Sequence, residues 1–246
     1  VRRGHFSKEM LVNLVTTSEL KTNVEPLKDK LLSLELEGEI KGISHIINDG
    51  VADVVKADEI RLLYGQDYFN ESLLGLNFKI STFSFFQTNS AGAEVLYQTV
   101  RDFAGYEKNS VIFDLYCGTG TITQLMSPVA EKVIGIEIVE EAVEAAKINA
   151  ELNGIKNCEF IAGDVLNMVD NLDYKPDLII LDPPREGINP KAIMKIINFN
   201  ADRLVYVSCK ASSLAKDLLV FEENGYKVEK AVSYTHLRAH ETDQYL

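Results

Sequence analysis

The sequence predicts an α/β protein whose larger part is a doubly wound parallel sheet and whose smaller N-terminal part is an α+β subdomain. From residue 110 onward, short Val- and Ile-rich segments alternate with long helical patterns, which is the rhythm of buried parallel strands joined by crossover helices. A glycine-containing turn follows the first of these strands. Residues 1–80 lack this rhythm and are richer in short β-branched and aromatic segments.

Composition indicates a globular chain. With 246 residues and 46% apolar content, it is long enough for one large domain or one domain plus a smaller one. No apolar run is long enough to span a bilayer, and the first residues lack the apolar core of a signal peptide, so we expect a cytoplasmic chain without a membrane partner. The sequence carries no signal of oligomeric state, and a monomer is the default expectation. Cys117, Cys158 and Cys209 lack C-x-x-C spacing, which predicts free thiols and no metal site.

The net charge restricts how the chain would bind nucleic acid. It is −12, from 25 Lys and Arg against 37 Asp and Glu. Because nucleic-acid binding depends on neutralising phosphates with Lys and Arg, a broad electrostatic contact is excluded. Any nucleic acid must be held by a local patch or by a part outside this chain.

Within residues 1–80, strands are expected at residues 10–17, 42–48 and 78–86 and a helix at 27–36. These segments predict a subdomain rich in antiparallel strands. His5 and His45 stand alone, which favours surface or hydrogen-bonded histidines over catalytic ones.

A polar junction joins the two parts. The letters F-F-Q-T-N-S at residues 85–90 precede a helical pattern that extends to Phe103. Thr88, Asn89 or Ser90 is expected to cap that helix. Gln87 is either a turn residue or a ligand contact.

In the larger part, residues 81–232, the elements follow in order. Helices are expected at residues 140–153 and 212–224, each followed by a glycine at the position where left-handed backbone ends a helix, Gly154 and Gly225. The expected strands cover residues 111–116, 132–138, 158–161, 177–181, 203–208 and 227–232.

The polar residues of interest follow the strands at their carboxyl ends, which is the edge where open α/β sheets bind ligands. After the first strand, glycine at 118 allows positive φ and close approach of a ligand, although an ordinary turn is the alternative. The expected positions on this edge are Tyr116, Gly118, Thr121, Glu137, Asp164, Asp182 and Cys209.

Three of these positions carry specific chemistry. Glu137 comes about 20 residues after the glycine turn, the spacing of a ribose-binding carboxylate, and its alternative is a surface carboxylate. Asp182 precedes Pro183 and Pro184, which fix its projection toward a planar polar substrate or simply end the strand. Cys209 is either a small buried residue or a nucleophile, because Lys210 and the following helix favour a thiolate.

Together the motifs F-F-Q-T-N, D-L-Y-C-G-T-G-T, G-I-E, D-P-P-R-x-G and Y-V-S-C resemble the RNA uracil-5-methyltransferase family. The resemblance implies a Rossmann-like domain that uses S-adenosylmethionine to methylate uridine in RNA, with 23S ribosomal RNA favoured over transfer RNA. It places Cys209 at the nucleophile position. It places the cofactor- and uracil-binding positions at Gln87, Tyr116, Thr121, Glu137 and Asp182.

The chain departs from the family pattern in three ways. The usual N-terminal RNA-binding barrel and iron–sulfur cysteine cluster are missing, so we expect a fragment of a longer enzyme. The common S-C-N-P is here S-C-K-A. Residues 233–246 lack the family's D-x-F-P and H-x-E motifs and resemble foreign sequence, so His240 and Glu241 are not expected to supply the catalytic base.

Two alternatives to the uracil enzyme remain. Methyltransferases for cytosine carbon 5 or an exocyclic amine share the fold, but they usually place Cys or an aromatic residue after Pro-Pro, where this chain has Arg185. The other alternative is a fragment that binds S-adenosylmethionine but is catalytically incomplete.

Overall fold

The computed structural model describes residues 1–20, 23–50, 57–105, 109–168 and 174–233. The chain divides into two compact units, residues 1–86 and 87–246, whereas the boundary expected from the sequence is at residues 80 and 81. None of the described helices is long and apolar enough to cross a membrane.

The first unit contains a four-stranded sheet in the order β1-β2-β3-β4 and a separate hairpin of β5 and β6. Strands β2 and β3 run parallel, while the other pairs are antiparallel. Its elements are β1 (Arg2–Arg3), β2 (Glu9–Thr16), α1 (Glu25–Leu32), β3 (Glu39–Ile47), β4 (Glu59–Gly65), β5 (Tyr68–Leu73) and β6 (Leu76–Ser81).

Two predicted elements of this unit have wrong boundaries. Helix α1 begins earlier than residue 27 and ends at Leu32, because Pro26 takes the first-turn position that proline favours, while Leu34 and Leu36 remain exposed and give no burial to extend the helix. Strand β6 ends at Ser81 rather than at residue 86.

The second unit is built on a five-stranded parallel sheet in the order β11-β10-β7-β8-β9. Its elements are α2 (Ser90–Ala104), β7 (Asn109–Leu115), α3 (Thr121–Leu125), the 3-10 turn η1 (Ser127–Val129), β8 (Ala130–Glu137), α4 (Glu140–Leu152), β9 (Cys158–Ala162), α5 (Val165–Met168), β10 (Leu178–Leu181), α6 (Pro190–Asn198), β11 (Arg203–Tyr206) and α7 (Ala211–Glu223). The predicted doubly wound fold class is confirmed.

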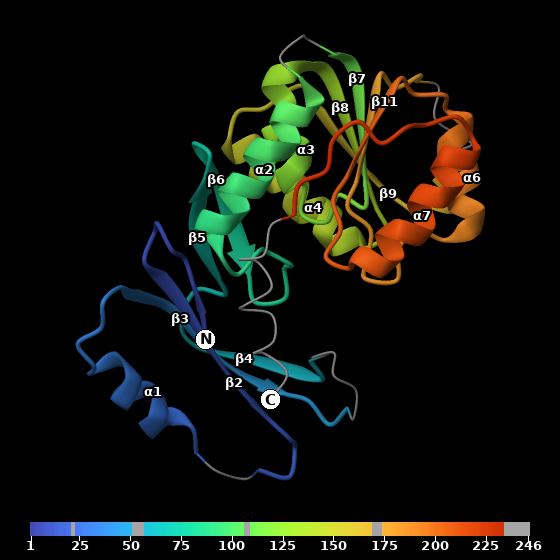
Figure 1. Ribbon diagram of the computed structural model, residues 1–246. Coiled ribbons are helices and arrows are strands. Elements are labelled where there is room, and N and C mark those ends of the chain that lie inside the picture. Colours follow the sequence, from blue (N-terminus) through green and yellow to red (C-terminus); the bar gives the residue numbers. More distant parts are fainter. Residues whose placement is uncertain (21–22, 51–56, 106–108, 169–173, 234–246) are drawn as a thin grey trace. The chain divides into compact units, whose positions relative to one another are not determined.

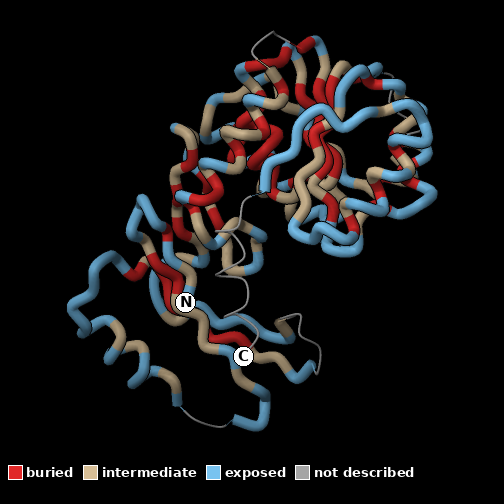
Figure 2. Tube along the Cα trace, in the orientation of Figure 1, coloured by how far each residue is buried: buried red, intermediate tan, exposed pale blue. Residues whose placement is uncertain are grey.

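Alternation along the strands divides the core of this unit between two faces of the sheet. One face carries Phe113 and Leu115, which pack with residues of α5, α6 and α7. The opposite face is covered by α4, whose Val143 and Ala146 pack on Phe160. Figure 1 shows α6 and α7 on one side of the sheet and α2, α3 and α4 on the other. The strands therefore lie between two helical layers and form the buried part of the unit (Figure 2).

The strand predicted at residues 227–232 is absent, and that prediction is wrong. The segment after α7 is irregular, and Val228 and Val232 are 42% and 66% exposed. Ordering a strand costs backbone entropy that ladder hydrogen bonds and apolar burial must offset. Neither Val side chain provides that burial, so the sequence does not form a strand here.

Candidate active site

The candidate site includes the glycine turn after β7. Both Gly118 and Gly120 have positive φ, 53° and 72°, but for different reasons. A Cβ on Gly120 would lie 2.5 Å from the Phe160 ring, so packing requires glycine there. A Cβ on Gly118 would meet nothing within 4 Å, so there is open space beside the backbone at this residue.

Glu137 ends β8 next to this turn. Its Oε2 accepts a hydrogen bond from the Gly118 N–H at 3.0 Å, and its Oε1 accepts one from the Val139 N–H at 3.0 Å. A carboxylate has about four lone-pair sites, so each oxygen keeps capacity for another donor. The side chain is half-buried, which leaves it within reach of a ligand.

Asp114 lies beneath the same turn and is completely buried. Its Oδ2 accepts a hydrogen bond from the Thr123 hydroxyl at 2.6 Å, whereas its Oδ1 has no partner among the described residues. Burial, partly opposed by the Thr123 hydrogen bond, raises the pKa of this carboxyl to about 7. An unpaired buried oxygen is costly, and a donor on a bound ligand would relieve that cost.

The raised pKa of Asp114 predicts a pH effect on stability. Between the unfolded pKa of 3.8 and the folded value of about 7, only the folded state keeps the proton, so the free energy of unfolding falls as the pH rises through this window. Asp114→Asn should therefore show a smaller loss of Tm between pH 5 and pH 8. The difference should be at least about 2–4 °C, the shift per kcal/mol for a domain of this size. An unchanged pH slope would contradict the assigned cause.

A second carboxylate, Asp182, follows β10 and is half-buried. Burial raises the pKa of Asp182 to about 7. Burial first, and then the nearby carboxylates of Asp182 and Asp114, raise the pKa of Tyr97 on α2, while a hydrogen bond with Gln87 opposes the shift. Gln87 is held at the start of α2, where the Asn89 side chain caps the helix by accepting the Gly92 N–H at 2.9 Å. The cap prediction is confirmed at Asn89.

Cys209 reaches the same edge from the neighbouring strand. In the parallel register, Leu181 of β10 is opposite Tyr206 of β11, and the Val207 N–H donates to the Leu181 carbonyl at 2.8 Å. Asp182 therefore follows β10 by one residue, and Cys209 follows β11 by three, at the carboxyl end of adjacent strands. The Cys209 side chain is exposed.

The three cysteines differ in what surrounds them. Burial raises the pKa of the Cys117 thiol well above its ordinary value, and it raises that of Cys158 to about 12. Both are thus poor nucleophiles, since the thiolate is the reactive form. Cys209 is the exposed thiol among the three.

A family model described as tRNA (Uracil-5-)-methyltransferase matches residues 6–238. The chain belongs to this family.

Curated relatives agree with this placement. Uncharacterized RNA methyltransferases from Clostridium tetani and Clostridium acetobutylicum are 53% and 56% identical to the chain over 230 residues. Each alignment covers 94% of this chain and 50% of the relative, so the chain spans about half the length of the curated relatives it matches.

Solved structures support the same fold. The crystal structure of Pyrococcus abyssi tRNA (uracil-54, C5)-methyltransferase in complex with S-adenosyl-L-homocysteine is similar with a TM-score of 0.75 and 27% identity, over 93% of this chain and 53% of that chain. A SAM-dependent methyltransferase, described as putative, from Streptococcus mutans has a TM-score of 0.58 at 13% identity, over 91% of this chain and 61% of that chain, and shows the fold alone.

In this member of the uracil-5-methyltransferase family, the structure brings some of the sequence-predicted residues together and leaves others apart. Gln87 and Asp182 share Tyr97 as a neighbour, and Glu137 contacts Gly118. Thr121, by contrast, is buried in the first turn of α3. Tyr116 has a φ of 70°, a conformation that costs energy for a non-glycine residue and is often found at functional sites.

Sequence reasoning missed Asp114 and Tyr97. Asp114 is the acidic residue inside the D-L-Y-C-G-T-G-T motif, so its place within an apolar strand was a usable signal. Tyr97 looked like one more apolar position on a helix, and only the tertiary structure brings its hydroxyl to the carboxylates.

The exposure of Cys209 predicts selective alkylation. Brief treatment of the folded chain with iodoacetamide should modify Cys209 at least about tenfold faster than Cys117 or Cys158, because a thiolate must be both formed and accessible to react. Peptide mass spectrometry at several time points measures this ratio. Equal labelling of the three thiols in the folded state would contradict it.

Proposed function

We propose that this chain is the methyltransferase part of an enzyme that methylates carbon 5 of uridine in RNA with S-adenosylmethionine as the donor. The observation that supports it most is the composition of one sheet edge. An exposed thiol, Cys209, and a half-buried carboxylate, Asp182, follow adjacent strands at this edge, and the glycine turn with Glu137 lies on the same edge. Family membership supports the same reaction.

The residues present fit the proposed cofactor. The open space at Gly118 accepts a ligand close to the backbone, and the spare lone pairs of Glu137 suit the two hydroxyls of a ribose. The unpaired Oδ1 of Asp114 suits a cationic or amide donor. Tyr116 and Thr121 stay proposed cofactor positions from the motif. When bound, S-adenosylmethionine supplies a methyl group that its sulfonium makes electrophilic.

Glu137→Ala tests the ribose assignment. Loss of the charge-assisted hydrogen bonds to the ribose hydroxyls should weaken S-adenosylmethionine binding by at least about 10- to 100-fold, the equivalent of roughly 1.5–3 kcal/mol for a single hydrogen bond to a charged group. Isothermal titration calorimetry measures the Kd. The control is Glu140→Ala, which removes an exposed carboxylate three residues further along. If both variants bind as tightly as the unsubstituted chain, the ribose assignment is wrong.

Cys209 supplies the nucleophile in this proposal. Carbon 5 of uracil is a weak nucleophile, so the thiolate first forms a bond to carbon 6, and the electrons of the 5,6 double bond move to the carbonyl oxygen as an enolate. Carbon 5 can then accept a methyl group. Loss of the carbon 5 proton to a base restores the double bond and expels the thiolate.

Asp182 orients the base in this proposal. Its half-buried side chain follows a strand and precedes Pro183 and Pro184, which restrict the backbone, so the carboxyl presents a fixed hydrogen-bonding edge to the uracil. Holding the ring in line with thiol and methyl group is a positioning effect. A uridine within a stacked RNA must be flipped out to reach it.

Incubation with labelled S-adenosylmethionine tests the reaction and the RNA class together. Separate reactions with 23S ribosomal RNA and transfer RNA, followed by nucleoside mass spectrometry, should give 5-methyluridine. The preference for 23S ribosomal RNA stays a prediction from the sequence, and the Pyrococcus abyssi neighbour is named for uracil 54 of a tRNA. Label in 5-methylcytidine or an N-methylated base would contradict the proposal.

The exposed, irregular segment after α7 favours a second candidate for this chain alone. Without an ordered strand at residues 227–232, the described part presents no framework there for a terminal base. His240 and Glu241 lie outside the described residues. In this second candidate the chain binds S-adenosylmethionine and forms the thiol adduct but does not release product.

A further inference from the structure

Helix α7 begins two residues after Cys209 and carries two buried polar side chains on one face. Ser213 and Asp217 are four residues apart, so they lie one above the other on the helix. Both are at least nine-tenths buried, with 6% and 8% exposure. Buried polar groups need partners, and both side chains find theirs on the loop that follows Asp182.

Their hydrogen bonds fix that loop at two residues, Arg185 and Ile188. The Asp217 Oδ2 accepts the Ile188 N–H at 2.8 Å, and the Ser213 hydroxyl donates to the Arg185 carbonyl at 2.6 Å. Between these points, Gly187 has a φ of 86°, and a Cβ there would lie 2.7 Å from the Asp217 Oδ2. The loop backbone thus passes directly against the carboxylate.

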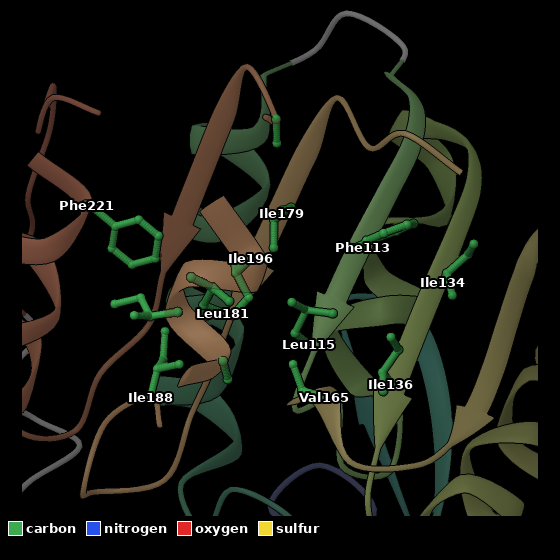
Figure 3. Close-up of a cluster of buried hydrophobic side chains, with 13 residues drawn as sticks. Phe113, Leu115, Ile134, Ile136, Val165, Ile179, Leu181, Ile188, Ile196 and Phe221 are labelled. Carbon is green, nitrogen blue, oxygen red and sulfur yellow. The ribbon is translucent and has the colours of Figure 1, made fainter. Parts of the chain in front are cut away.

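The same carboxylate also holds the end of β11. The Tyr206 hydroxyl donates to the Asp217 Oδ2 at 2.6 Å. Burial first, then this hydrogen bond, raises the pKa of Tyr206, and Tyr116 and Asp182 lie near enough to contribute. Apolar packing accompanies these contacts. Ile188 of the loop, Phe221 of α7 and Leu181 of β10 belong to one buried cluster (Figure 3).

We propose that Asp217, assisted by Ser213, is a positioning residue that fixes the loop after Asp182 relative to the Cys209 thiol. This inference rests on the proposed function. Asp182 and Cys209 lie on two different loops, one after β10 and one after β11. Helix α7 links these loops, because it begins just after Cys209 and its first two turns hydrogen-bond to residues 185–188. A misplacement of about 1 Å between reacting groups costs about 100-fold in rate.

The test compares Asp217→Ala, Asp217→Asn and Ser213→Ala with Glu222→Ala, which removes an exposed carboxylate from the same helix. The first readout is the rate of adduct formation with a 5-fluorouridine RNA at increasing RNA concentrations. The second is the Kd for S-adenosylmethionine. The third is hydrogen exchange of the Ile188 amide, which requires no catalysis.

Asp217→Ala should lower the maximal adduct rate by about 10- to 100-fold, while the half-saturating RNA concentration and the cofactor Kd change less than about threefold. Exchange at Ile188 should become faster. Asp217→Asn keeps an acceptor oxygen and should recover most of the rate, and Ser213→Ala should lose less than Asp217→Ala. Glu222→Ala should match the unsubstituted chain.

Two results would overturn the inference. One is an unchanged rate or unchanged Ile188 exchange in Asp217→Ala. The other is loss of cofactor binding together with adduct formation in both Asp217 variants, which indicates a merely structural residue. Absence of an adduct in the unsubstituted chain would contradict the nucleophile assignment itself, and the exchange readout then shows separately whether Asp217 holds the loop.

Discussion

Cys209→Ala is expected to abolish methyl transfer to RNA, by more than about 10³-fold, while the Kd for S-adenosylmethionine stays within about twofold. Removal of an enzyme's nucleophile costs several orders of magnitude because no other group activates the substrate. Binding should survive because the glycine turn, Asp114 and Glu137 lie on β7 and β8, away from β11. Label transfer and calorimetry measure the two quantities.

Cys158→Ala is the matched control. It makes the same substitution at a half-buried thiol on the α4 side of the sheet, packed near Phe160, where no part in the chemistry is proposed. Its methyl transfer should remain within about twofold to threefold of the unsubstituted chain. Substantial transfer by Cys209→Ala would refute the covalent mechanism even if the reaction product is 5-methyluridine.

The second large effect is expected at Asp182. Asp182→Ala should lower the maximal rate of methyl transfer by about 10²–10³-fold, because the uracil ring then lacks the hydrogen bond that orients it. Asp182→Asn keeps the shape and one acceptor oxygen and should lose less. Steady-state kinetics with RNA varied at saturating S-adenosylmethionine measure both variants.

Asp202→Asn serves as the control for charge. It neutralises an exposed carboxylate just before β11 begins, at the opposite end of the strand from Cys209. Its kinetics should be unchanged. If Asp182→Ala instead raised only the cofactor Kd and left the maximal rate intact, Asp182 would belong to cofactor binding alone.

Much of the larger unit was predictable because local pattern and tertiary environment agree there. The run from Val111 to Leu115 is apolar except at Asp114, and it becomes the central strand β7, where both faces are covered. Gly154 and Gly225 end helices with positive φ as expected, at 65° and 95°. Where the apolar residues of a segment are buried and its glycines take the left-handed backbone expected at a helix end, the sequence pattern alone predicts the element.

The failures occur where the outcome depends on distant partners. A strand was predicted at residues 227–232, but this segment stays exposed and its Val side chains have no apolar surface to pack against. Likewise, the motif residues predicted which strand ends carry chemistry, but not that Tyr97 comes from α2 to join Asp182 and Asp114. The hydrogen bond from the Ile188 N–H to Asp217 joins residues 29 positions apart, and no local sequence pattern predicts it.

The most direct test of the covalent mechanism is mass spectrometry of the chain after incubation with S-adenosylmethionine and a 5-fluorouridine RNA. Fluorine at carbon 5 cannot leave as a proton, so the adduct should accumulate even without a base. The mechanism predicts a methylated nucleotide adduct on the peptide that contains Cys209. An intact chain that binds S-adenosylmethionine but carries no adduct, or carries it on Cys117 or Cys158, would contradict it.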